Sequence, residues 1–116
     1  MFHTFDIIRV PFPFSGSPRL SKTRPALVVS SHTEFGNKIG HSVVAMITSA
    51  KHSKFPLDTP IRHFAKAGLP KECVVRMKLF TIDHRLVLEK KGKLDSSDEE
   101  QVSFSLRKLF SLSLAH

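Results

Sequence analysis

The sequence predicts a mainly β protein of the α+β class, in which a small barrel or a strongly curled sheet is followed by a C-terminal α-helix. Two observations carry this prediction. Five short runs rich in valine, isoleucine and phenylalanine precede an end of the chain whose apolar residues have helical spacing. Five strands of about 5 to 9 residues in so short a chain favour a barrel or a curled sheet. At 116 residues the chain is long enough for its own hydrophobic core, so we expect a single domain, residues 1–116.

The predicted strands alternate with segments that favour loops. Residues 15–23, between the first two runs, are polar, basic and turn-forming. Pro25 has no N–H donor and therefore belongs at the very start of the second strand, which leaves Arg24 at the mouth of this loop. The predicted strands are Asp6–Phe14, Arg24–Ser30, Ser42–Thr48, Glu72–Lys78 and Arg85–Lys90.

Two further segments interrupt the strands. Asp58–Leu69 predicts either a short helix or an irregular connection, because Pro60 and Gly68 bound it closely. Gly92, which lies among lysines, predicts a tight turn.

The end of the chain predicts an amphipathic helix. Ser96 or Ser97 can cap it, with Glu99 or Glu100 three residues later to complete a capping box. Asp98 adds a negative charge near the positive end of the helix, so we interpret the acidic cluster as capping rather than catalytic. The apolar positions follow i, i+4, i+7, i+8 spacing, and one face should therefore pack on the sheet: Val102, Leu106, Leu109, Phe110 and Leu114.

The positive charge is concentrated in the strand-rich body. Residues 1–94 contain 16 Lys and Arg against 6 Asp and Glu, giving +10, whereas residues 95–116 contain 2 against 4, giving −2. Such a body attracts polyanions, of which nucleic acid is the commonest. A basic surface that serves only solubility is the alternative interpretation.

Several classes of protein and site are disfavoured. Cys73 is the single cysteine, so an internal disulfide is excluded and a small core residue is expected. The chain has no secretory leader and no apolar run of the roughly 20 residues that a membrane-spanning helix needs, so we expect a cytoplasmic protein. No His, Cys, Asp or Glu set has the spacing of a zinc site and no glycine-rich phosphate loop is present, so we expect neither a metal nor a cofactor.

Three short strings occur in an informative order. They are PFPF at Pro11–Phe14, RPALVVS at Arg24–Ser30 and ITS at Ile47–Ser49. With Ala67–Leu69, Val74–Arg76 and Met77–Asp83 further along, the chain resembles the MazF/PemK-type toxins of type II toxin–antitoxin systems. The resemblance implies an SH3-like barrel of antiparallel strands with a C-terminal helix, assembled as a homodimer. It also implies an endoribonuclease that cuts single-stranded RNA at short sequences without a metal, and an acidic antitoxin as partner.

The resemblance extends to individual catalytic residues. Arg24 matches the family's arginine in the Arg-Pro pair and Thr48 its hydroxyl residue at a strand end, so both are expected at the scissile phosphate. Arg76 matches an arginine that some members use at the active site. Those members carry an aspartate two residues later, where this chain has Lys78, so the general base is unassigned. Of the histidines, His41 and His52 are nearest in sequence to the expected site.

Other polar and aromatic residues near these positions are expected to contact RNA. Arg76 and Lys78 are two apart on a predicted strand and should add charge to one groove. A phenylalanine could stack on a base, although burial in the core is favoured for Phe12, Phe14 and Phe55. The expected RNA-binding residues are Ser49, Lys78, Lys22, Arg19 and Lys51.

Two other functions stay open at this level. One is a toxin of the same fold class that poisons DNA gyrase by binding alone, and the other is an RNA-binding barrel without catalysis. Arg24 and Thr48 favour the nuclease, because a protein that only binds does not need such a pair.

Overall fold

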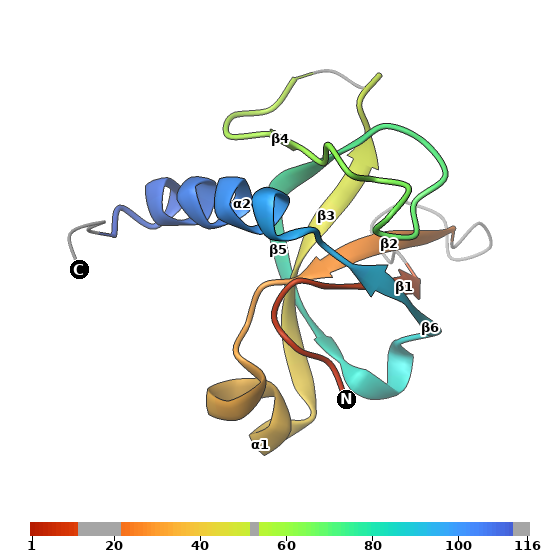
Figure 1. The fold of residues 1–116 in the computed structure, drawn as a ribbon. Coiled ribbons are helices and arrows are strands. Elements are labelled where there is room, and N and C mark those ends of the chain that lie inside the picture. The colour runs from red at the N-terminus through yellow and green to blue at the C-terminus, as the bar shows by residue number, and fades with distance from the viewer. Residues whose placement is uncertain (12–21, 52–53, 113–116) are drawn as a thin grey trace.

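A computed structural model describes residues 1–11, 22–51 and 54–112. Its centre is an antiparallel six-stranded sheet with the strand order β4-β5-β3-β2-β1-β6. Figure 1 shows that the sheet is strongly curled and that helix α2 lies against β5. The elements are β1 Asp6–Pro11, β2 Thr23–Val28, α1 Asn37–Ile39, β3 His41–Ser49, β4 Thr59–Pro60, β5 Cys73–Asp83, β6 Glu89–Lys93 and α2 Ser96–Leu109.

Alternation of side chains along the strands gives the sheet two buried apolar faces. In β1, Ile7 belongs to the cluster that includes Val102 of α2, whereas Ile8 and Val10 belong to the cluster on the other face. Successive side chains of a strand point to opposite faces, so a sheet buried on both sides has apolar residues at consecutive positions. Cys73 is buried within the first cluster, which confirms the expectation of a core residue.

The predicted strands are confirmed in part. The second and third predictions match β2 and β3 to within two residues at each end, and β5 continues to Asp83, beyond the predicted end at Lys78. The prediction for Arg85–Lys90 is wrong at its start: residues 84–86 form a 3-10 turn, and β6 begins only at Glu89. The side chain of Asp83 accepts a hydrogen bond from the Arg85 amide, which stabilises this turn. The predicted extension of the first strand to Phe14 lies outside the described residues.

Gly92 does not form the predicted turn but lies inside β6. A Cβ atom at this position would lie 2.4 Å from the carbonyl oxygen of Ala67. Gly92 therefore permits the irregular connection of residues 61–69 to pass close to the backbone of β6. The segment Asp58–Leu69, predicted as a short helix or an irregular connection, is the irregular connection: it contains the two residues of β4 and then turns, with no helix.

Helix α2 is present as predicted, but its cap and part of its packing differ. Its N-cap is Asp95, whose side chain accepts a hydrogen bond from the Ser97 amide, and not Ser96 or Ser97. Asp98 is buried and accepts hydrogen bonds at 3.0 Å from the amides of residues 62 and 63, so it ties the irregular connection to the helix. Its carboxylate is structural, in agreement with a non-catalytic interpretation of the acidic cluster.

The predicted apolar stripe packs on the sheet only in its first half. Val102 is fully buried and Leu106 packs against the same cluster. Leu109 is exposed and Phe110 is 55% exposed, because the C-terminal half of α2 extends beyond the sheet in Figure 1. Leu114 lies outside the described residues.

Candidate functional site

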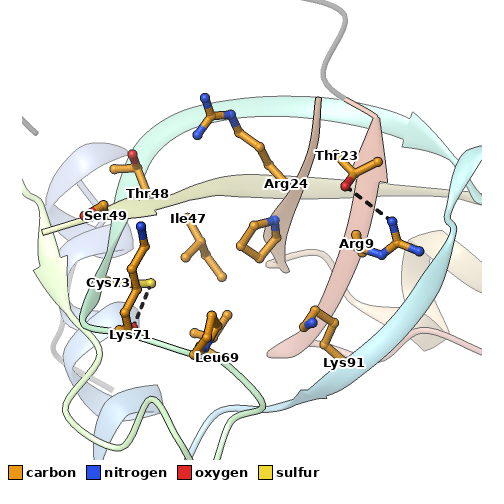
Figure 2. A pocket seen from close by; sticks show the side chains of 12 residues that line it. Arg9, Thr23, Arg24, Ile47, Thr48, Ser49, Leu69, Lys71, Cys73 and Lys91 are labelled. Atoms are coloured by element: carbon orange, nitrogen blue, oxygen red, sulfur yellow. Dashed lines mark hydrogen bonds between the residues drawn. The ribbon is translucent and has the colours of Figure 1, made fainter. Parts of the chain in front are cut away.

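Arg24 and Thr48 lie on neighbouring strands at the same end of the sheet. Ala26 of β2 pairs with Met46 of β3. Arg24 lies two residues before Ala26 and Thr48 two residues after Met46, so both side chains leave the same face of the sheet. Figure 2 shows both rising from the same side of the strands. The register thus brings together two residues that are separated by 24 positions in the sequence.

Arg24 and Thr48 are each flanked by a further strand on their outer side. Val10 pairs with Arg24 on one side, and Val74 pairs with Thr48 on the other. Thr48 is 6% exposed and Arg24 is partly buried. A guanidinium and a hydroxyl on one face of neighbouring central strands are groups that can donate hydrogen bonds to an anionic oxygen.

Arg76 has a different environment from Arg24. Its Nε donates to Oδ1 of Asp58 at 3.1 Å, and its Nη2 donates to Oδ2 at 2.8 Å. These bonds raise the pKa of the guanidinium above its ordinary value. Arg76 itself is buried, so its charge is largely balanced by the Asp58 carboxylate.

Lys78 shares an aromatic neighbour with Arg76. The Lys78 ammonium lies 5.3 Å from the centroid of the Phe55 ring, and the Arg76 guanidinium lies 5.4 Å from it. Both distances are within the range of a cation–π contact. The two cations are therefore on the same side of β5, as their spacing predicts. Phe55 is only partly buried, so it is neither a core residue nor a free stacking surface.

Three of the remaining expected RNA-binding residues are described, and they lie at the same end of the sheet. Lys22 and Lys51 are exposed next to β2 and β3. The Ser49 hydroxyl accepts a hydrogen bond from the Lys51 amide at 3.3 Å. Arg19, His52, Phe12 and Phe14 lie outside the described residues.

His41 is not near this site. It occupies the first position of β3, whereas Thr48 is close to the end of the same strand. Seven residues of extended strand separate the two by about 23 Å. Its ring contacts the carbonyl of Ile39 and lies 3.9 Å from the carboxylate of Asp83, at the opposite end of the sheet.

A pocket of about 230 Å³ lies beside the same strand ends. Figure 2 shows the ends of Arg24 and Thr48 pointing away from Leu69 and Lys91, so the pocket interior is on the other side of β2 and β3. Three cationic residues at its edge were not among the predicted site residues, because they are far apart in the sequence: Arg9, Lys71 and Lys91.

The described residues were also searched for other kinds of site. They contain no group of three or more His, Cys, Asp or Glu side chains that could hold a metal ion. No helix in the described ranges has the length and apolar character needed to cross a membrane.

Comparisons with known proteins identify similar families and folds. A family model described as PemK-like, MazF-like toxin of type II toxin–antitoxin system matches residues 3–110. Among solved structures, the chain is 17% identical to a MazF from Deinococcus radiodurans, with a TM-score of 0.72 over 96% of this chain and 97% of that one. It is 23% identical to the Mycobacterium tuberculosis toxin MazF-mt6, with a TM-score of 0.70 over 93% and 98%.

A third similar structure is a complex. It is a MazE–MazF assembly from Deinococcus radiodurans, 19% identical, with a TM-score of 0.74 over 97% of this chain and 98% of that one. At these identities the likeness concerns the fold, which is the curled antiparallel sheet and C-terminal helix expected from the sequence. No curated protein matches the chain significantly.

Proposed function

The chain belongs to the PemK-like, MazF-like toxin family of type II toxin–antitoxin systems, and from this premise we propose that it is an endoribonuclease. Its substrate is single-stranded RNA, cut at short sequences. The observation that carries the proposal is the placement of Arg24 and Thr48 on one face of two neighbouring central strands, at the same end of the sheet. The net charge of +8 supports a polyanionic substrate.

In the proposed reaction the 2′-oxygen of the substrate attacks the neighbouring phosphorus. The 2′-hydroxyl loses its proton to a base, a phosphorane forms, and the bond to the 5′-oxygen breaks as that oxygen takes up a proton. The Arg24 guanidinium and the Thr48 hydroxyl donate hydrogen bonds to the non-bridging oxygens, where negative charge accumulates. The products are a 2′,3′-cyclic phosphate and a 5′-hydroxyl.

Arg76 supports this reaction indirectly in our proposal. Its two hydrogen bonds to Asp58 already engage the guanidinium, so its capacity to stabilise a phosphorane is smaller than that of Arg24. It positions Asp58 and Phe55, and through Phe55 the ammonium of Lys78. Of the two cations beside Phe55, Lys78 is the one that can reach an RNA phosphate, because its side chain is exposed whereas Arg76 is buried.

We also propose two protein partners. An acidic antitoxin would cover the basic body and compete with RNA, in line with the MazE–MazF complex of similar fold. A second copy of the chain would form a homodimer. Exposed apolar residues in the C-terminal half of α2 and just after its end suit a protein–protein contact, since such patches are uncommon on monomers: Phe104, Leu109, Phe110 and Leu112.

The direct test is incubation of the purified protein with a long single-stranded transcript. We expect discrete cuts by the unaltered protein and almost none by Arg24→Ala, with equal folding of the two by circular dichroism. The matched control is Arg107→Ala, which removes an arginine from the distant helix α2 and should cut normally. Binding of the transcript without any cutting would contradict the nuclease and favour a protein that acts by binding alone.

A further inference from the structure

Four of the seven histidines lie at the end of the sheet where β3 begins. The ring of His3 lies over that of His32, with 4.1 Å between the ring centroids and 35° between the ring planes. The positive charges of His32 and His41 both act on the ring of His84, so these side chains are neighbours. Figure 1 shows the N-terminus and α1 at this same end of the molecule. We refer to His3, His32, His41 and His84 as the histidine cluster.

Residues 1–3 lie against this cluster and against the sheet. The Phe2 ring meets the His84 ring nearly at a right angle, with 5.0 Å between the centroids and 80° between the planes. Phe2 also packs against the apolar cluster that contains Ile8. His84 is itself anchored to β3, because its Nε2 atom lies 2.7 Å from the hydroxyl oxygen of the buried Ser42. The rings of the histidine cluster therefore fasten the N-terminal residues to the sheet.

The surroundings of His32 disfavour a charged ring. Its Nδ1 atom is buried and has no hydrogen-bond partner within the described part of the chain. A protonated imidazole donates from both nitrogens, so the charged ring would bury an N–H group without an acceptor. It would also face the His3 ring at 4.1 Å, and two charged rings at this separation repel each other. A proton on His32 thus favours an arrangement in which water reaches the ring.

His84 also fits this arrangement best when it is uncharged. Burial lowers the pKa of its ring, and the positive charge of His41 lowers it further. The α-amino group and His32 act in the same direction, whereas Asp83 opposes them. Asp83 compensates only in part, because its carboxylate also accepts a hydrogen bond of 2.7 Å from Nη2 of Arg85. A proton on His84 therefore favours exposure of its ring to solvent.

The other charged groups around the cluster leave these positive charges uncompensated. Asp6 accepts a hydrogen bond from the His3 amide at 2.7 Å, but its carboxylate lies 3.3 Å from the ammonium of Lys90, which balances its charge. Glu34 and Lys38 lie in the sequence between two of the cluster's histidines and are exposed, so water and salt screen their charges.

We propose that the histidine cluster is a proton-operated latch that holds residues 1–3 on the sheet at neutral pH and releases them in mildly acidic solution. Imidazole rings ordinarily take up protons between pH 5 and 8. As they do so, the stack of His3 on His32 separates, and Phe2 leaves the apolar cluster. The inference is independent of the proposed function, because the latch lies at the end of the sheet opposite to Arg24 and Thr48.

The release ends at Thr4. The Thr4 hydroxyl donates to the carbonyl of Ser30 at 2.8 Å, and the Phe5 amide donates to the carbonyl of Val28 at 2.7 Å. None of these groups takes up a proton between pH 5 and 8. Phe5 has a φ of 72°, which non-glycine residues adopt rarely, so the chain turns sharply at this point. The latch therefore frees the side chains that precede Thr4 and leaves β1 in place.

NMR spectroscopy of the full chain at pH 7.5, 6.5, 6 and 5 measures the release directly. The two readouts are the nuclear Overhauser contact between the Phe2 and His84 rings and the relaxation of the Phe2 amide. We expect the population of the closed latch to fall by about 10-fold or more between pH 7.5 and pH 5, because protonation favours the open form. The amide shifts of β2 and β3 beyond Val43 should stay unchanged, since the latch opens only locally.

Two variants of the stack have a matched control. His32→Phe and His3→Phe each keep an aromatic ring but remove its proton-binding nitrogens, so the latch should open at a lower pH than in the unaltered protein. His63→Phe makes the same change at an exposed histidine 3.7 Å from Asp95, the N-cap of α2, and should open as the unaltered protein does.

Three results would overturn the latch. The first is a Phe2 amide that stays ordered at pH 5. The second is release at the same pH in the unaltered protein and in whichever of His32→Phe and His3→Phe folds. The third is a loss of signal dispersion throughout the chain at the pH where Phe2 is released, because this would show general acid unfolding.

Discussion

The ion pair between Arg76 and Asp58 gives the sharpest prediction about stability. Asp58→Asn removes the negative charge that balances a buried guanidinium and keeps one of the two acceptor oxygens. Removal of one partner of a fully buried pair costs about 3–5 kcal/mol. The two side chains here are 10% and 16% exposed, so solvent recovers part of this loss, and we expect a cost of about 2–3 kcal/mol.

This cost translates into a measurable change in melting temperature. With an unfolding entropy of about 2.1 cal/mol/K per residue, 116 residues give a decrease of about 10 °C. Chemical denaturation followed by circular dichroism provides the free energy directly. The matched control is Glu89→Gln, which removes the charge of an exposed pair with Arg9 and should cost no more than about 1 kcal/mol.

A double-mutant cycle with Arg76→Met isolates the interaction between the two side chains. If the structure is correct, the double variant should be less destabilised than the sum of the single variants by about 2 kcal/mol. Additive effects, or an Asp58→Asn variant as stable as Glu89→Gln, would refute the assignment of Arg76 as a positioning residue.

Three further predictions concern the active site, RNA binding and pH. Arg24→Ala and Thr48→Ala should each reduce single-turnover cleavage by a factor of about 10² to 10³, because both donate to the phosphorane. The melting temperature should change little, since Arg24 is partly exposed and Thr48, although buried, belongs to neither apolar cluster; a large loss of stability would instead make the residue structural. Sedimentation should show a homodimer. For each tenfold increase in salt concentration, the logarithm of the RNA affinity should fall by about 0.7 per phosphate neutralised, and Lys78→Glu should weaken binding more than Lys108→Glu. A monomer, or an RNA affinity that does not depend on salt, would contradict this. Burial, with the positive charge of His41, lowers the pKa of His84 below 6.5. The stability that His84 contributes is therefore complete above pH 6.5 and is lost as the pH falls through its lowered pKa. Chemical denaturation at pH 7.5 and pH 5 should show a smaller decrease in the free energy of unfolding for His84→Gln than for the unaltered protein.

Much of the fold could be predicted from the sequence, because its strands carry strong local signals. Consecutive β-branched residues identified β2 and β3, and Pro25 fixed the start of β2 to within two residues. The two residues of β4 have no detectable signal, since so short a strand exists only through its pairing with β5. The wrong prediction of a turn at Gly92 has a different cause. Local sequence associates glycine with turns, whereas here it permits a close approach from Ala67, which only the tertiary fold brings near.

The candidate site was predicted where a local pattern exists and missed where it does not. Arg24 and Thr48 each occur in a recognisable string, and the β2–β3 register then places them together. The partner of Arg76 could not be found by spacing, because Asp58 lies 18 residues earlier in an irregular connection. Lys71 and Lys91 line one pocket only in the folded chain, where the connection that precedes β5 passes close to β6.

The most direct test of the central claim is the end chemistry of a defined transcript cut in excess EDTA. The account predicts that cleavage persists, that the products carry a 2′,3′-cyclic phosphate and a 5′-hydroxyl, and that a 2′-deoxy nucleotide at the scissile position stops it. A site for catalytic metal ions needs clustered carboxylates, and residues 1–94 contain only six acidic residues, which are scattered along the sequence: Asp6, Glu34, Asp58, Glu72, Asp83 and Glu89. In this account the nucleophile is therefore the 2′-oxygen of the substrate. Cutting that requires a divalent metal, or products with a 5′-phosphate, would contradict it.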